Sequence, residues 1–360
     1  MLNALFAPLL SLHLLCDTSA PTAQTADADA YERHMELEVA GKVVRVLRSS
    51  GPMLRTDTLV VVHKGTSLEL SNFAGVINVN AWERNAVRVQ AEHSRRDRIV
   101  LELRDKVLTV DSENRAGMPA YVNYYLTVPQ WMPLELSGVN TEIAINNMKA
   151  AVSAESVSGD VLVRGTSGEL DLSSIEGMVR VMDATGSVDA TSVNNDVRLE
   201  RISGTVSCES VQGNIRLEQL TSRDVSASSM NGMVLFMGDF KPKGRYALTS
   251  HMGNIVVGVP EEAGLDVSVV NFLGAFRTGF PVKTGSIPNK RGAEFNFTLG
   301  GGGSSLDLES YQGLIQLMRP MELKAKLARL APLATPTPRG VPQIAPTPPT
   351  PPEPESPEHR

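Results

Sequence analysis

The sequence predicts an all-β protein whose main part is a parallel, two-sided β-solenoid (β-helix) with about 18 residues per coil. One observation is a nine-residue repeat that runs without a gap from Thr141 to Thr221. Another is that apolar side chains recur at the third, fifth and eighth places of each unit. Because a single unit can bury its apolar face only against its neighbours, the repeat indicates a stack of coils.

Each unit contains one short strand. The third place holds Ile143, Val152, Val161, Leu170, Val179, Val188, Val197, Val206 and Ile215. The fifth place holds Ile145, Ala154, Val163, Leu172, Val181, Ala190, Leu199, Cys208 and Leu217. Places two residues apart point to one face of a strand, so the residue between them points outward. That outward place carries charged residues such as Asp171, Arg180 and Asp189, as expected.

A corner follows each strand. The eighth place is again apolar except for Thr166, and we expect it to belong to the same buried face: Met148, Val157, Ile175, Ala184, Val193, Ile202, Val211 and Leu220. Glycine at the first place of most units predicts a tight corner with a positive φ. Strict alternation and a glycine every nine residues exclude a helix.

A finer period gives the length of a coil. The seventh place is serine in alternate units only, at Ser156, Ser174, Ser192 and Ser210. The arginines of the fourth place alternate in the same way. The true period is therefore 18 residues, with two strands per coil and residues i and i+18 stacked about 4.8 Å apart. We expect the serines to form a hydrogen-bonding ladder at one corner.

Weaker copies of the pattern extend the prediction to the whole chain. One residue is inserted at Ser222, after which the repeat resumes. The predicted organisation is a leader at 1–30, an irregular N-terminal β region at 31–130, a solenoid at 131–320, a short helix at 321–331 and a Pro-rich tail at 332–360. The N-terminal β region should cap the stack. The tail has a composition that cannot form a packed core. Within the solenoid we expect regular coils at 132–239, excursions at 259–303 and a closing coil at 304–318. The helix should dock on the last coil through Leu323, Leu327 and Leu330.

The N-terminus predicts export. An apolar stretch from Leu2 to Leu15 precedes small residues with signal-peptidase spacing. Lipidation at Cys16 is disfavoured because His13-Leu14-Leu15 lacks the small residue expected before the cysteine. No later apolar run is long enough to span a bilayer. We therefore expect a monomer in the periplasm, the cell envelope or the secreted fraction, with no transmembrane segment after removal of the leader.

Composition disfavours several function classes. The formal net charge is −6, so no basic field is present to attract nucleic acid. Histidines 34, 63, 93 and 251 lack metal-ligand spacing, and neither a phosphate-binding loop nor a nucleophile motif is present. A calcium-binding roll would need acidic residues in every turn, whereas Asp160 and Asp196 are isolated. We expect no cofactor, no metal and no enzymatic activity.

Two outward columns are candidate sites. Arg180, Arg198 and Arg216 are spaced by 18 residues, with glutamates two places further along. The carboxylates could simply offset repulsion between stacked arginines, or the column could bind an anionic partner such as a surface glycan or a lipopolysaccharide phosphate. Asp171 and Asp189 would stand within the carboxylate separation of a retaining glycosidase. A charge at an outward place is nevertheless the default for a solvated ladder, and no neighbouring sequence indicates a substrate cleft.

Four runs resemble the bacterial DUF4097 family, whose members are named as candidate adhesins. They are Tyr125–Pro129, Leu134–Gly138, the Ser-Gly-Asp-Val turn at Ser158–Val161, and Leu306–Leu317. The likeness extends roughly from Val43 to Met318. It implies a β-helical exported protein and supplies no catalytic residue. We therefore expect a non-enzymatic binding or structural protein that contacts a cell-surface glycan or an envelope protein. The alternatives are a polysaccharide-processing β-helix enzyme and an envelope-stress accessory module that binds another protein.

Overall fold

In the part of the chain that the structure describes, the residues form strands and one helix. A computed structural model describes residues 33–39, 42–49, 53–114, 120–282 and 293–330. Its elements are β1 (Arg33–Val39), β2 (Lys42–Ser49), β3 (Leu54–Val61), β4 (Ser67–Trp82), β5 (Ala86–His93), β6 (Asp97–Arg104), β7 (Val107–Asn114), β8 (Tyr121–Pro129), β9 (Leu134–Asn146), β10 (Val152–Ser156), β11 (Val161–Arg164), β12 (Ser167–Ser174), β13 (Val179–Ser192), β14 (Val197–Ser210), β15 (Ile215–Glu218), β16 (Asp224–Ser229), β17 (Val234–Met237), β18 (Arg245–Ser250), β19 (Ile255–Gly258), β20 (Leu265–Asn271), β21 (Ala275–Thr278), β22 (Ala293–Leu299), β23 (Ser304–Ser310), β24 (Leu314–Met318) and α1 (Pro320–Leu330).

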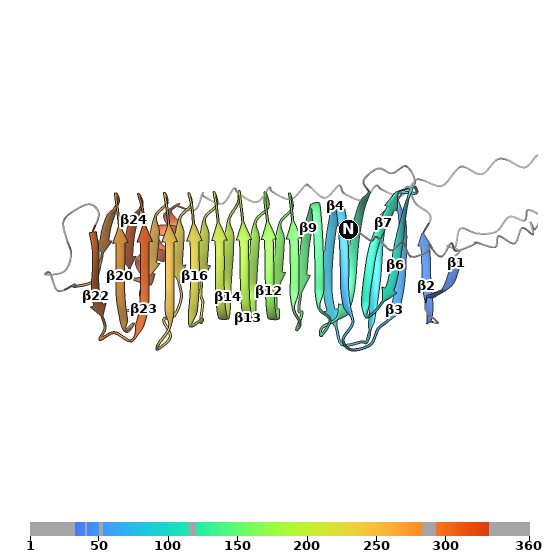
Figure 1. Ribbon diagram of the computed structural model, residues 1–360, viewed down its shortest axis with the longest axis horizontal. Coiled ribbons are helices and arrows are strands. Elements are labelled where there is room, and N and C mark those ends of the chain that lie inside the picture. Colours follow the sequence, from blue (N-terminus) through green and yellow to red (C-terminus); the bar gives the residue numbers. More distant parts are fainter. Residues whose placement is uncertain (1–32, 40–41, 50–52, 115–119, 283–292, 331–360) are drawn as a thin grey trace, which may run out of the picture.

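The strands stack side by side along one long axis (Figure 1). The leader predicted at 1–30, with Cys16, and the Pro-rich tail predicted at 332–360 lie outside the described residues. Among the residues that the structure describes, no helix is long and apolar enough to cross a membrane. The all-β fold class expected from the repeat is confirmed.

The central strands are parallel and in the register that the repeat predicts. Val161 pairs with Val179, Val179 with Val197, and Val197 with Ile215. Each step is 18 residues, because strands such as β11 and β12 alternate along the chain and each pairs with the equivalent strand one period away. The step from Val206 to Val225 is one residue longer, which confirms the insertion at Ser222.

One apolar core runs through the stack. The third and fifth places are buried throughout the repeat, from Ile143 and Ile145 to Ile215 and Leu217. Each of these side chains lies above its equivalent in the next coil, so that the core consists of columns of aliphatic residues. The residues between them are half-buried or exposed, as the alternation predicted.

The eighth place differs from the prediction in every second unit. Met148, Ala184, Ile202 and Leu220 are buried, and so is Thr166. Val157, Ile175 and Val211 are 40%, 46% and 43% exposed. The two corners of a coil are therefore not equivalent. At one corner the eighth side chain turns into the core, and at the other, directly after a ladder serine, it turns out to solvent.

Backbone conformation explains the difference between the corners. The seventh-place residue of the inward corner has a left-handed conformation, with φ of 61° at Asn147, 56° at Asp183 and 55° at Arg201. The expectation that first-place glycines supply positive φ is only partly correct. Gly186 has a φ of 120°, but no positive φ occurs at Gly177. A Cβ at Gly177 would lie 2.0 Å from the carbonyl oxygen of Gly159, so close stacking requires that glycine.

The C-terminal coils are stacked in a different order from the predicted one. Residues 259–303 were expected to leave the stack and 304–318 to close it. Instead β23 and β24 pair with β18 and β19 on one side and with β20 and β21 on the other. The excursion itself thus supplies a further coil, and β22 adds to β20 in antiparallel register. Leu265, Val267 and Val269 bury the inward face of that added coil.

The N-terminal region combines antiparallel and parallel pairing. Strands β3, β5 and β8 pair antiparallel, and β4 then pairs in parallel with both β8 and β9.

Helix α1 begins at Pro320, as the leucine spacing predicted to within a residue. Leu323 is 1% exposed and packs with Leu235, Met237 and Val256, which point outward from β17 and β19. The helix therefore lies on the flank of the coils, where these outward places are apolar.

Candidate functional site

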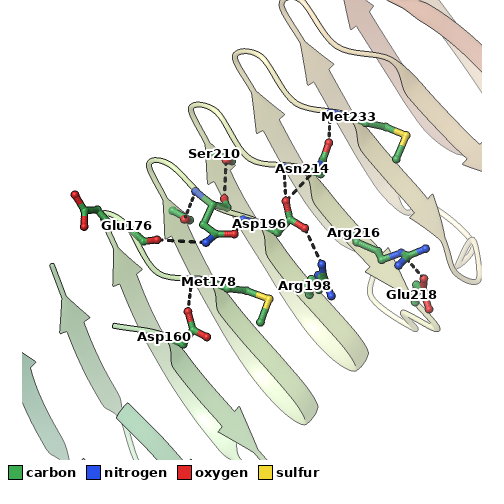
Figure 2. Close-up of polar contacts among 12 residues, drawn as sticks. Asp160, Glu176, Met178, Asp196, Arg198, Ser210, Asn214, Arg216, Glu218 and Met233 are labelled. Carbon is green, nitrogen blue, oxygen red and sulfur yellow. Dashed lines mark hydrogen bonds and ion pairs between the residues drawn. The ribbon is translucent and has the colours of Figure 1, made fainter. Parts of the chain in front are cut away.

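The arginine column is assembled by three neighbouring strands. Arg180 of β13 pairs in register with Arg198 of β14, and Arg198 with Arg216 of β15. Figure 2 shows Arg198 and Arg216 on adjacent strands of one face. Their inward neighbours on each strand are buried aliphatic residues, which fixes the backbone and leaves the guanidinium groups on the surface. The structure thus brings together all three predicted residues.

Every arginine of this column has a carboxylate partner. Arg180 lies 3.7 Å from Glu200, Arg198 2.8 Å from Asp196, and Arg216 2.7 Å from Glu218, measured between guanidinium nitrogen and carboxylate oxygen. Glu200 and Glu218, the two glutamates expected beside the column, thus each pair with one of its arginines. The third partner, Asp196, is not one of the two predicted glutamates.

A second set of charges extends the column towards the inward corner. Arg201 lies 2.6 Å from Asp183 and also pairs with Glu200, while Arg164 is 3.7 Å from Asp183. The hydrogen bond from Arg201 holds the pKa of Asp183 below its ordinary value, and the same contact raises the pKa of Arg201. Because the left-handed backbone at Asp183 and Arg201 places both side chains on the outer surface of the corner, the network continues from coil to coil.

Asp196 has a structural task as well as an electrostatic one. It accepts hydrogen bonds from the backbone N–H and the side-chain amide of Asn214, at 3.0 and 3.1 Å. Burial would raise the pKa of Asp196, but the bonds from Arg198 and Asn214 outweigh it and lower that pKa. Asp160 accepts the N–H of Met178 in the same way, at 2.7 Å. These second-place carboxylates therefore connect successive coils (Figure 2).

The face keeps open donors despite its ion pairs. The side chains of Arg180, Arg198 and Arg216 are 40%, 44% and 41% exposed. A guanidinium has five N–H donors in a fixed fork, so a single carboxylate leaves several free to reach a ligand. We refer to the three column arginines with Glu200, Glu218 and Asp196 as the arginine face. Chemically it offers alternating cations and acceptors at the spacing of the coils.

The opposite face carries Asp171 and Asp189, the two aspartates considered as carboxylates of a retaining glycosidase. Asp171 and Asp189 are register partners on β12 and β13. Burial, followed by the negative charges of Asp171 and Glu209, raises the pKa of Asp189. A shallow cavity of about 280 Å³ lies beside Asp171 and is also lined by Glu135 and Glu169. The linear pattern could not reveal this cavity, because its walls come from β4, β9, β10 and β12.

Two further reactive side chains, Cys208 and His93, are packed inside the protein. Cys208 is buried in the core, and burial raises the pKa of its thiol well above the ordinary value. His93 is also buried and contacts Thr56 at 2.8 Å. Within the part of the chain that the structure describes, no group of three or more histidine, cysteine or acidic side chains is arranged to hold a metal ion.

Comparisons with known proteins give distant structural likenesses. No protein-family model and no curated protein matches the sequence. A candidate adhesin from Parabacteroides merdae shares 9% identity and a TM-score of 0.40 over 74% of this chain and 96% of that one. A candidate cell adhesion protein from Clostridium sporogenes shares 11% identity and a TM-score of 0.19 over 74% and 99% of the two chains. A candidate lipid-binding protein from Parabacteroides distasonis shares 9% identity and a TM-score of 0.29 over 74% and 97%.

Proposed function

We propose that this chain is a two-sided β-solenoid that acts as a non-enzymatic binding protein, with the arginine face as its contact for an anionic glycan. The observation that carries the proposal is the register of Arg180, Arg198 and Arg216, which repeats one guanidinium on each of three successive coils. Neighbouring rungs of a sheet are about 4.8 Å apart, comparable with the length of one sugar residue. An extended polysaccharide could then contact several rungs together.

The chemistry of the face fits such a ligand. Free guanidinium donors bind carboxylate, sulfate or phosphate groups in pairs of hydrogen bonds. The carboxylates of Glu200 and Glu218 can accept hydrogen bonds from sugar hydroxyl groups. Repetition along the stack gives multivalency, so weak contacts at single rungs add to a useful affinity for a polymer but not for a monosaccharide.

Substitution of the column tests the proposal. Changing Arg180, Arg198 and Arg216 to serine should leave the apolar columns intact and reduce binding to immobilised lipopolysaccharide or heparin. Each exposed ion pair contributes only about 0–1 kcal/mol to folding, so the variant should stay folded. The matched control changes Arg98, Arg245 and Arg277, three exposed arginines elsewhere, to serine and removes the same charge. Equal binding by both variants would refute a role for the column.

A second candidate function rests on the cavity beside Asp171. Two carboxylates on adjacent coils, one of them with a raised pKa, are the groups that a retaining glycosidase needs. This reading predicts release of reducing ends from an acidic or neutral polysaccharide, and loss of that activity in both Asp171→Asn and Asp189→Asn. Unchanged turnover in either variant would exclude the pair as the catalytic carboxylates.

We also propose export to the periplasm or cell surface and kinship with the DUF4097 family. Support comes from the apolar N-terminal stretch and from the four sequence runs described above. N-terminal sequencing of protein recovered from the periplasm is expected to begin between about Ala23 and Tyr31. An intact Met1 on folded cytoplasmic protein would contradict export.

A further inference from the structure

The outward corner carries a line of mostly apolar side chains that continues from coil to coil. The serine ladder continues in register through Ser229, Ser250 and Ser310, and Asn72, Gly138 and Asn271 take the equivalent place in the outer coils. The line occupies the place directly after each of these residues and comprises Phe73, Val139, Val157, Ile175, Val193, Val211, Met230, His251, Tyr311 and Phe272. We call this set the apolar ridge. Most of its members are between 40% and 51% exposed. His251 stacks on Tyr311 with ring centroids 4.7 Å apart, so this histidine continues the line.

The serine ladder forces these side chains outward. Ser174 is buried, donates its hydroxyl to the carbonyl oxygen of Gly159 at 2.9 Å, and accepts the N–H of Gly177 at 2.9 Å. With Ser174 pointing inward, the next residue, Ile175, must point away from the core. Ser156 and Ser192 make the same pair of contacts. The ridge is therefore fixed by the fold and repeats with every coil.

Its size exceeds what a monomer normally leaves exposed. At the spacing between rungs of about 4.8 Å, ten rungs extend over about 45 Å. Eight of its ten side chains are 40–51% exposed. At roughly 150 Å² of full accessible surface for a large apolar side chain, the ridge offers on the order of 700 Å², above the roughly 300–600 Å² typical of the largest apolar patch on a monomer. Single exposed apolar residues need no explanation, but an aligned series of this length does. The area approaches the roughly 800 Å² that each partner buries in a stable dimer.

The flanks of the ridge are polar and carry few charges. The following place holds residues such as Asn140, Ser158 and Gln212, and the place before the ladder holds Ser173 and Thr191. The charged exceptions are all negative: Glu155, Glu176, Glu209 and Glu309. Met252 and Leu273, which follow His251 and Phe272, are apolar and exposed and widen the ridge at its C-terminal end. A charge-depleted apolar core with a polar rim is the composition of an interface between proteins. The acidic exceptions oppose contact with an anionic membrane surface.

We propose that the apolar ridge is the interface through which two copies of this chain associate side by side. Two ridges share the same spacing of rungs, so the side chains of one fit between those of the other. A two-fold arrangement makes the same residues contact each other from both sides. The expected monomer is thus replaced by a dimer whose two arginine faces remain free, because the ridge lies at a corner and not on the face that carries Arg198.

Sedimentation equilibrium on the full chain tests the proposal. The ridge variant Ile175→Lys, Val193→Lys, Val211→Lys adds three charges to half-exposed positions. The control Ser153→Lys, Ser207→Lys, Ser226→Lys adds the same charges to outward places of β10, β14 and β16. Wild type and control should dimerise at micromolar concentration, and the ridge variant should weaken association by about 100-fold or more. Association should strengthen from about 0.05 to 0.5 M NaCl, because salt screens the acidic flanks.

Melting temperature and circular dichroism establish that each variant is folded. If the lysine variant does not fold, Ile175→Ser, Val211→Ser replaces it, with a correspondingly smaller loss of association. A wild-type chain that stays monomeric at about 100 µM, or a control that dissociates like the ridge variant, would overturn the proposal. It would also be overturned by a monomeric wild type that binds phosphatidylcholine vesicles through the ridge, since the occupant would then be a lipid surface.

Discussion

Substitution of one ladder serine gives a quantitative test of how the coils are held together. Ser174→Ala removes a hydroxyl that donates to the carbonyl oxygen of Gly159 and accepts the N–H of Gly177, both at 2.9 Å. The N–H of Gly177 is buried, so water cannot readily replace the lost acceptor. A net hydrogen bond contributes about 1 kcal/mol, and a buried group left without a partner costs about 1–3 kcal/mol. The expected loss in free energy of unfolding is about 2–3 kcal/mol.

Urea denaturation followed by circular dichroism measures this loss. Ser173→Ala is the matched control, because Ser173 lies on the same strand and points outward, half-buried. Its free energy of unfolding should stay within about 0.5 kcal/mol of wild type. The slope against urea should be equal in all three proteins, which would show that the same surface is exposed on unfolding. Equal stability of Ser174→Ala and Ser173→Ala would refute the assignment of the ladder as a structural element.

Two further outcomes follow from the corners and the acidic column. Gly177→Ala should lower the free energy of unfolding by more than about 3 kcal/mol, because its Cβ would meet the carbonyl oxygen of Gly159 at 2.0 Å. The control is Gly301→Ala, where an added Cβ meets nothing within 4 Å. It should lower the free energy of unfolding by only about 1 kcal/mol, because of the φ of 89° at that position. The pKa of Asp189 is raised in the folded protein, so its contribution to stability is present below its ordinary pKa of 3.8 and is lost as pH rises through the folded value. Asp189→Asn should therefore raise the melting temperature relative to wild type at pH 7, with the gain vanishing below pH 3.8, and a gain that is independent of pH would contradict the raised pKa.

The repeat predicted the strands because their constraints are local. Alternation within each unit fixes which residues of β13 and β14 point inward, and the 18-residue spacing of Ser192 and Ser210 fixes their register. The arginine column was predictable for the same reason, since residues at the same place in successive coils must stack. The pairing of Arg216 with Glu218 followed from their separation by two places, whereas Glu200 pairs with Arg180 of the preceding coil and not with Arg198.

The corners and the C-terminal order could not be predicted in this way. Val157 and Met148 are both apolar at the eighth place, so hydrophobicity alone does not distinguish the exposed corner from the buried one. The distinguishing signal is the preceding residue, a buried serine in one case and a left-handed Asn147 in the other. At the C-terminus, β20 and β23 have the same alternation, and their order depends on which of them first pairs with β18. That choice is a long-range contact without a local sequence signature.

Paired deletions test the central claim, an 18-residue coil with two unlike corners, most directly. Deleting Gly177–Asn194 removes one coil and joins equivalent places, so every apolar column, the serine ladder and the ridge stay in register. Deleting only Gly177–Thr185 removes half a coil and sets the inward corner against the outward one. The melting temperature of the first variant should lie within a few degrees of wild type, and that of the second far below it. Equal melting temperatures for the two deletions would contradict the coil.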